Sequence, residues 1–286
     1  MPSLKALRGR IKSVKNTRQI TKTMKMVAAA KVRRARSNVE AARPYAQRLG
    51  GVLSNLAATC TTGGPLLLAG RAEVKTVRLM VMGSDRGLCG GFNANVLKQL
   101  FAEVKRLQAA GKTVQIFAVG RKVRDGVRIA YPQLLMGAKM DISRSINFAL
   151  AEELAQQATD AFVAGECDMV KLVFSRCVSM LTQTPVAQQL IPFEATATAS
   201  AKASFAYEPD EAAILADLLP RNIKTQVFCA LLESMASEQA ARMTAMDNAT
   251  RNAGEMIQKL TLTYNRNRQA AITKELIEII SGAQAV

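Results

Sequence analysis

The stretch from Asp210 to Val286 constrains the fold most, because it predicts one helix of more than seventy residues. After Pro220 it contains no proline, and its only glycines are Gly254 and Gly282. Apolar or small residues recur in it at steps of four and three, with Arg242 as an interruption: Phe228, Leu232, Met235, Met246, Ala249, Ala253, Met256, Leu260, Ala270 and Ile277. So long a pattern without stop signals is typical of a coiled coil, a membrane span or a helical repeat.

Charged residues such as Asp247, Arg251 and Lys259 exclude the membrane span. A helix of this length would extend roughly 110 Å, several times the width of a small domain. Most of it therefore needs a partner helix, and we expect its far end to contact another protein.

The N-terminal segment predicts that partner helix, from Leu4 to about Ala57, with Ser3 as its N-cap and an irregularity at Pro44. Its predicted seam is rich in small residues, which suits close helix pairing better than a thick core. The seam comprises Leu4, Leu7, Ile11, Val14, Ile20, Met24, Val27, Val32, Ala35, Val39, Ala42, Ala46, Leu49, Leu53 and Leu56.

Between the two helices, compact apolar runs typical of buried strands alternate with segments of helical period. This pattern predicts a small α/β domain with a mainly parallel sheet. We expect strands at 77–82, 114–119, 169–174 and 185–192, and helices from Asn93 to about Ala110 and from Ser143 to Ala164. The fold class is therefore a long antiparallel coiled coil of the terminal helices plus a central Rossmann-like α/β domain. The predicted domains are residues 1–58, 70–195 and 209–286.

The formal net charge of +17 is concentrated in one element. Residues 1 to 48 hold fourteen Lys or Arg against the single acid Glu40. Such a segment suggests an acidic partner, which could be nucleic acid, an anionic membrane surface or an acid-lined protein cavity. No aromatic residue precedes Tyr45 to stack on bases, so a protein-facing basic surface is at least as well supported as nucleic acid.

The residues predict no independent catalytic site, no metal site and no cofactor. Histidine is absent, and the five cysteines are scattered without metal-ligand spacing, which fits a reducing compartment. The glycine-rich turn Gly83 to Gly91 follows a strand and precedes a helix, but it lacks the ending of a P-loop and the glycine spacing of a dinucleotide site. We interpret it as a structural turn, with Asp85 and Arg86 as turn or interface residues.

Three stretches, in this order along the chain, resemble signatures of the gamma subunit of F-type ATP synthases. The first is Ile11 to Ala29 (IKSVKNTRQITKTMKMVAA), and the second is Ser84 to Gly91 (SDRGLCGG). The third signature lies in the last helix and has two parts, Ser237 to Met246 (SEQAARMTAM) and Tyr264 to Ile280 (YNRNRQAAITKELIEII). The resemblance spans essentially the whole chain.

The resemblance implies a noncatalytic central-stalk rotor subunit of a bacterial ATP synthase, which couples proton-driven rotation of the c-ring to ATP synthesis and hydrolysis on the beta subunits. The implied partners are the alpha and beta subunits of the hexamer, the epsilon subunit and the c-ring, with no nucleic acid. The implied location is the cytoplasmic face of the bacterial inner membrane, as a peripheral protein. The alternative function is that of a basic coiled-coil nucleic-acid-binding protein.

Carried over residue by residue, the resemblance implies contacts with the beta subunit and with the c-ring. Arg268, Gln269 and Arg242 match positions that contact a beta-subunit loop, and Met24 and Lys25 match the position facing the acidic lever segment of the beta subunit. Tyr207 and Glu208 match the foot that meets the c-ring.

Overall fold

The computed structural model describes residues 3–59, 65–142, 146–194 and 211–284. By compactness the chain divides into two units, one of Met1–Ala29 with Arg242–Val286 and the other of Ala30–Ala241. The two long helices, α1 (Leu4–Thr59) and α6 (Glu211–Gln284), contribute to both units. The predicted division into residues 1–58, 70–195 and 209–286 stays a prediction.

Both long helices are confirmed, with ends within two residues of those expected from the sequence. The hydroxyl oxygen of Ser3 accepts a hydrogen bond from the backbone N–H of Ala6 at 3.2 Å, as expected of an N-cap. Pro44 and Pro220 lie inside the helices, which continue through them. A proline removes one backbone donor, and the flanking turns keep the helix continuous here.

The buried side of α1 follows a strict seven-residue repeat, which is the pattern of a coiled coil. Two series of buried or half-buried residues make up this repeat: Leu7, Val14, Thr21, Ala28, Ala35, Ala42, Leu49 and Leu56, and Leu4, Ile11, Lys25, Val32, Val39, Ala46 and Leu53, with exposed Arg18 completing the second series.

The predicted seam is therefore wrong at two positions, since Ile20 and Val27 are 60% and 53% exposed. The repeat places Thr21 and Ala28 in the seam instead. The apolar pattern alone selects Ile20 and Val27, each one position before the true seam residue. It does so because it takes no account of polar side chains such as Thr21, which pairs with α6 across the seam.

The unit of Ala30–Ala241 contains a five-stranded sheet with the order β3-β2-β1-β4-β5. The strands are β1 (Thr76–Met82), β2 (Thr113–Val119), β3 (Leu135–Lys139), β4 (Met169–Cys177) and β5 (Gln183–Ile191). The first four strands pair in parallel, and β5 pairs antiparallel with β4. The mainly parallel sheet is thus confirmed.

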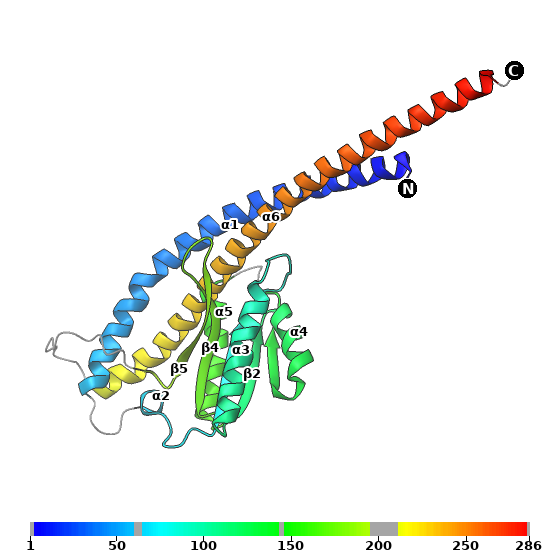
Figure 1. Ribbon diagram of the computed structural model, residues 1–286. Coiled ribbons are helices and arrows are strands. Elements are labelled where there is room, and N and C mark those ends of the chain that lie inside the picture. The colour runs from blue at the N-terminus through cyan, green and yellow to red at the C-terminus, as the bar shows by residue number, and fades with distance from the viewer. Residues whose placement is uncertain (1–2, 60–64, 143–145, 195–210, 285–286) are drawn as a thin grey trace. The chain divides into compact units, whose positions relative to one another are not determined.

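Helices cover both faces of the sheet (Figure 1), because alternate residues of each strand point to opposite faces. Val77, Leu79 and Val81 of β1 pack against α3 (Phe92–Ala109) and α4 (Arg121–Ala130). Met80 and Met82 pack with α5 (Phe148–Val163) and with residues of α6 such as Val227. Two apolar layers result, one on each face.

The starts of two helices differ from those expected. Helix α3 begins at Phe92, one residue before the expected start at Asn93, and Gly91 is its N-cap. The side chain of Asn93 bonds to Ser84. The predicted start of α5 at Ser143 lies outside the described residues, and Asn147 is the N-cap, whose side chain accepts from the backbone N–H of Leu150 at 3.0 Å.

Some elements gave no clear signal in the sequence. Helix α4, the 3-10 turn Pro132–Leu134 and β3 follow one another between β2 and α5. A further short helix, α2 (Leu66–Ala69), precedes β1.

Candidate functional site

In the unit of Met1–Ala29 with Arg242–Val286, α1 and α6 pair antiparallel through polar contacts (Figure 1). Arg8 Nη2 donates to the hydroxyl oxygen of Tyr264 at 2.7 Å, and its guanidinium lies 5.7 Å from the centroid of the same ring. The hydroxyl groups of Thr21 and Thr250 lie 2.8 Å apart. From the first contact to the second, the residue number rises by 13 on α1 (Arg8 to Thr21) and falls by 14 on α6 (Tyr264 to Thr250). Such opposite changes are expected of antiparallel helices.

Lys25 forms the next contact of this series, because its Nζ lies 2.6 Å from Asp247 Oδ1. The hydrogen bond from Lys25 lowers the pKa of the Asp247 carboxyl below its ordinary value. Both side chains are about half exposed, so the pair remains accessible to a third charged group. Lys25 is therefore engaged within its own chain as well as being available to a partner.

Two of the predicted contact residues accompany Lys25. Met24 precedes it on α1, and Arg242 lies five residues before Asp247 on α6. Both Met24 and Arg242 are half-buried. Met24, Lys25 and Arg242 therefore form one group of predicted contact residues.

Arg268 and Gln269 form a second, separate group. Both are exposed, and Arg268 lies 21 residues beyond Asp247 on the same helix. At about 1.5 Å per residue, roughly 30 Å separates the two groups. The remaining predicted contacts, Tyr207 and Glu208, lie outside the described residues.

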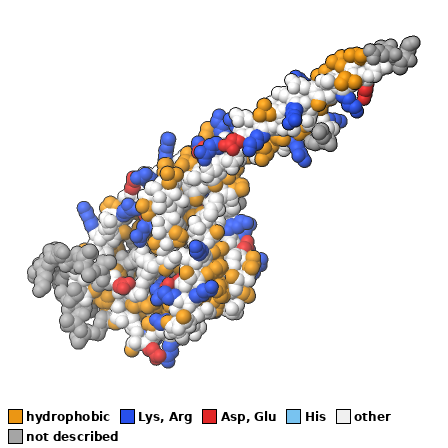
Figure 2. Space-filling view, viewed as in Figure 1, with side chains coloured by type: hydrophobic (Ala, Val, Ile, Leu, Met, Phe, Trp, Pro, Cys, Tyr) orange, Lys and Arg blue, Asp and Glu red, His pale blue; other side chains and the backbone are white. Residues whose placement is uncertain are grey.

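The last turns of α6 carry an exposed apolar surface that the sequence did not single out as a site. Its members are Ile272, Leu276, Ile277, Ile279 and Ile280, which are 49% to 68% exposed. Figure 2 shows hydrophobic side chains gathered towards the C-terminal end of α6. Since α1 begins at Leu4 and the Arg8–Tyr264 contact is near its start, this part of α6 extends beyond its partner helix. A contiguous apolar surface of this kind indicates a protein partner.

On α1, Ile20 and Val27 lie seven residues apart and face away from the seam. Together with exposed Met26, they form an apolar stripe on a helix that is otherwise rich in Lys and Arg. Their exposure could have been found from the sequence by extending the seven-residue repeat of the later turns back through this segment.

The glycine-rich turn after β1 uses its polar groups to hold itself together. The side-chain oxygen of Asn93 accepts from the backbone N–H of Ser84 at 3.1 Å, and Ser84 and Cys89 are buried. A Cβ at Gly83 would lie 1.8 Å from Cγ2 of Val123. The interpretation as a turn that permits close packing is consistent with these contacts.

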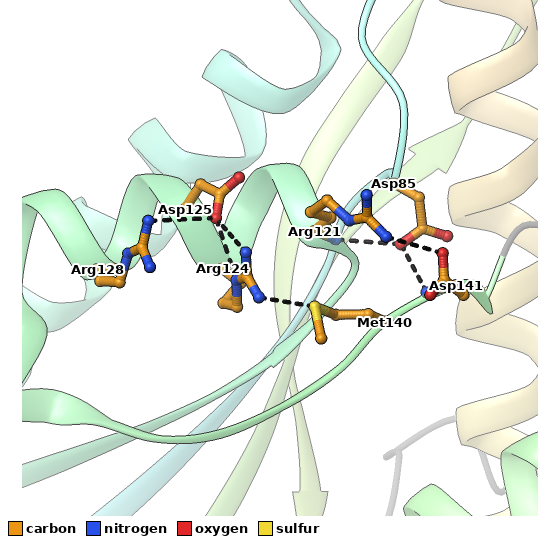
Figure 3. A network of polar contacts seen from close by, with 7 residues as sticks. All are labelled: Asp85, Arg121, Arg124, Asp125, Arg128, Met140 and Asp141. Carbon is orange, nitrogen blue, oxygen red and sulfur yellow. Dashed lines mark hydrogen bonds and ion pairs between the residues drawn. The ribbon is translucent and has the colours of Figure 1, made fainter.

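Asp85 fastens the carboxyl ends of three neighbouring strands (Figure 3). Its Oδ1 accepts from the backbone N–H of Arg121, which follows β2, at 3.1 Å, and from that of Asp141, which follows β3, at 3.0 Å. The side chains of Arg121 and Asp141 also form an ion pair at 3.0 Å. Asp85 is therefore a structural residue of the turn.

In open α/β sheets, ligands bind at the carboxyl ends of the strands where the strand order reverses. In this sheet that place lies between β1 and β4, and α6 occupies it. Ser234 Oγ donates to the carbonyl of Met82 at 3.3 Å, and Ser237 Oγ donates to the carbonyl of Ser175 at 2.9 Å, with both serines buried. The usual nucleotide crevice of this fold is thus filled by the chain's own helix.

The part of the chain that the structure describes contains no group of three or more acidic or cysteine side chains placed to hold a metal ion. None of the described helices is long and apolar enough to cross a membrane.

Comparisons with known proteins agree over the full length. The family model described as ATP synthase matches residues 3–286. The ATP synthase gamma chain of Fuscovulum blasticum is 54% identical, and that of Rhizobium leguminosarum bv. trifolii is 52% identical, each over 100% of both chains.

Solved structures are similar as well. A chain of the central stalk and c-ring of Tetrahymena thermophila mitochondrial ATP synthase matches with a TM-score of 0.61 and 28% identity, over 80% of this chain and 99% of that one. A chain of Euglena gracilis mitochondrial ATP synthase has a TM-score of 0.68 over 99% of this chain and 94% of that one. At 20% identity, the second likeness supports the fold alone.

The paired helices and the exposed apolar end of α6 indicate a subunit that acts through other proteins. With full-length relatives at 52% and 54% identity, the class can be stated more closely. The chain belongs to the gamma-subunit family of bacterial ATP synthases.

Proposed function

We propose that this chain is the central-stalk rotor of an ATP synthase, which couples rotation of a c-ring to ATP synthesis and hydrolysis on the beta subunits. The observation that carries the proposal is a full-length match to gamma chains on a fold whose longest helix extends beyond its own partner. The chain contributes no catalytic group. Its part is mechanical, because its orientation decides which beta subunit changes conformation.

The alternative function, that of a basic coiled-coil protein that binds nucleic acid, is not supported, because the full-length relatives are ATP synthase gamma chains. Two basic residues of α1 also have acidic partners on α6, since Lys25 pairs with Asp247 and Arg43 pairs with Glu233.

In this proposal the far part of α6 binds a loop of the beta subunit. Exposed Arg268 and Gln269 make the contact, and Arg242, which lies 26 residues earlier on α6 and therefore roughly 40 Å away, contacts the beta subunit at the height of Lys25. A few charge-assisted hydrogen bonds at set heights favour one resting orientation without locking the rotor.

The acidic lever segment of the beta subunit contacts the coiled coil at a different height. Met24 and Lys25 face this segment, supported by the exposed apolar stripe that contains Ile20 and Val27. Since the Lys25–Asp247 pair is half exposed, Lys25 can reach an acidic partner without a change in the helix.

The remaining partners in the proposal are the alpha subunits of the hexamer, the epsilon subunit and the c-ring, the last contacted by Tyr207 and Glu208. The rotor then lies at the cytoplasmic face of the bacterial inner membrane as a peripheral subunit. The exposed apolar end of α6, which includes Leu276 and Ile280, inserts into the alpha–beta hexamer.

Reconstitution tests the function directly. Alpha and beta subunits assembled with and without the chain should differ in cooperative ATP hydrolysis, with faster and cooperative turnover when the chain is present. Unchanged hydrolysis would contradict the proposal.

The loop contact predicts that Arg268→Ala weakens assembly more than Arg251→Ala. Loss of a charge-assisted hydrogen bond costs about 1.5 to 3 kcal/mol, so the affinity for the alpha–beta hexamer should fall roughly tenfold or more. Arg251 is a matched control, because it is an exposed arginine of the same helix whose Nη2 already donates to Asn248 within the chain at 2.6 Å. Titration of labelled chain into the hexamer measures both affinities, and equal losses would count against the loop contact.

A further inference from the structure

Glu233 of α6 joins three elements of the unit Ala30–Ala241 through one carboxylate. Its Oε1 accepts from Arg43 Nη2 of α1 at 2.8 Å, and its Oε2 accepts from the backbone N–H of Cys177, at the end of β4, at 2.9 Å. The side chain of Glu233 is only 11% exposed, whereas that of Arg43 is 52% exposed. The hydrogen bond to Glu233 raises the pKa of the Arg43 guanidinium above its ordinary value.

The turn of α6 that carries Glu233 is bonded to the sheet at neighbouring positions. Ser234 donates to the carbonyl of Met82 at the end of β1, and Ser237 donates to the carbonyl of Ser175 in β4. Ser234 is the next residue after Glu233 and Ser237 lies one helical turn further on, so this part of α6 and the carboxyl ends of the strands form one hydrogen-bonded block.

Around this block, small and apolar side chains make part of the contact of α1 with α6. Ala35 and Val39 of α1 pack with Leu232 and Ala236 of α6, and all four are buried. Apolar contacts are non-directional, and an alanine-rich seam offers little shape to resist sliding or rotation of one helix against the other. A polar group in such a seam specifies the register, because displacement leaves a buried charge without its partner.

We propose that Glu233 is a positioning residue that fastens α1 and β4 to the same turn of α6, so that torque passes between the sheet and both helices without slippage. The inference rests on the proposed rotor function and assigns part of that function to a named contact. A displacement of α1 by one helical turn, about 5.4 Å along its axis, would carry Arg43 away from Glu233.

The experiment uses the whole ATP synthase in sealed vesicles and measures ATP-driven proton pumping and ATP hydrolysis on the same preparation. The variants are Arg43→Gln, Glu233→Gln, the double variant and Arg43→Lys. We expect the pumping rate per ATP hydrolysed to fall about threefold in each single Gln variant, and no further in the double variant, because both remove the same interaction. Arg43→Lys keeps the charge and should recover at least part of the ratio.

The matched control is Arg36→Gln. Arg36 is an exposed arginine on the same helix, and it pairs with Glu40 of that helix at 2.8 Å. Removing this pair leaves α1, α6 and β4 connected, so the ratio of pumping to hydrolysis should remain that of the wild type.

The outcomes separate the inference from the function on which it rests. If the wild-type chain supports coupled pumping and both Gln variants keep the wild-type ratio, the inference is wrong and the rotor function stands. If pumping and hydrolysis fall in parallel with the melting temperature of the complex, the contact is structural only, which also overturns the inference. If the wild-type complex neither pumps nor hydrolyses cooperatively, the rotor function itself fails. Arg43→Gln changes a half-exposed side chain, so it keeps the test valid if Glu233→Gln does not fold.

Discussion

Gly120→Ala should destabilise the chain by about 4 kcal/mol, since it adds backbone strain of about 1 to 3 kcal/mol to crowding of similar cost. Gly120 follows β2 and has a φ of +108°, which side-chain-bearing residues rarely adopt. A Cβ at this position would lie 2.8 Å from the carbonyl oxygen of Gly83 and 2.9 Å from its carbon. Because these are backbone atoms, the turn after β1 has to move. Urea unfolding of the full chain, followed by circular dichroism, measures the loss.

Gly111→Ala is the matched control for this prediction. Gly111 follows α3 with a φ of +71°, but an added Cβ would meet nothing within 4 Å. Its cost is that of the left-handed conformation alone, roughly 1 to 2 kcal/mol. Equal destabilisation by the two substitutions would show that crowding against Gly83 contributes nothing.

Glu103→Gln should lower the free energy of unfolding by about 2 to 3 kcal/mol at pH 7, because a pKa shift of one unit corresponds to about 1.4 kcal/mol. Glu103 of α3 is buried and accepts from Arg106 at 2.7 Å and from Lys171 of β4 at 2.9 Å. The hydrogen bond from Arg106, aided by Lys171, lowers the pKa of the Glu103 carboxyl to about 2 from its ordinary 4.5.

The same shift determines how this difference depends on pH. The folded pKa of Glu103 is depressed, so its stabilisation is present above the unfolded pKa of 4.5 and is lost as the pH falls towards 2. The difference between wild type and Glu103→Gln should therefore be constant from pH 7 to about pH 5.5 and should fall by roughly half at about pH 3. Urea unfolding at a series of pH values measures it.

Glu166→Gln serves as the comparison for Glu103→Gln. Glu166 also pairs with a basic residue, Arg78, at 2.9 Å, but its side chain is 60% exposed. An exposed ion pair contributes between 0 and about 1 kcal/mol. A loss at Glu166 as large as that at Glu103 would contradict the role assigned to burial.

Much of the fold could be predicted from the sequence where the hydrophobic pattern is long or compact. The uninterrupted period of α6 and the apolar runs of β1, β2 and β4 each predict their element, because many residues agree on one period. Helix α4 and β3 were missed, since α4 buries only Val123 and Val127 and β3 is a five-residue edge strand paired on one side. Such elements depend on the neighbours that they pack against.

Some of the contact residues could likewise be predicted from the sequence, and others could not. The exposure of Arg268 and Gln269 fits the resemblance that singled them out, and their partners stay a prediction. Glu233 gave no signal, because an acidic residue in a long helix has the same sequence pattern whether it faces solvent or binds Arg43 and Cys177.

The sequence by itself determined that two long terminal helices flank an α/β domain, because local periodicity is written in consecutive residues. Only the tertiary structure decided that α6 fills the crevice between β1 and β4 and that Glu233 joins three elements. The hydrogen bonds that attach α6 to the sheet and to α1 join residues between 38 and 256 positions apart, and their pairing is set by the packing of the folded chain. Helix α6 can therefore be predicted from the sequence as a helix, whereas its register against α1 and its attachment to the sheet are properties of the fold.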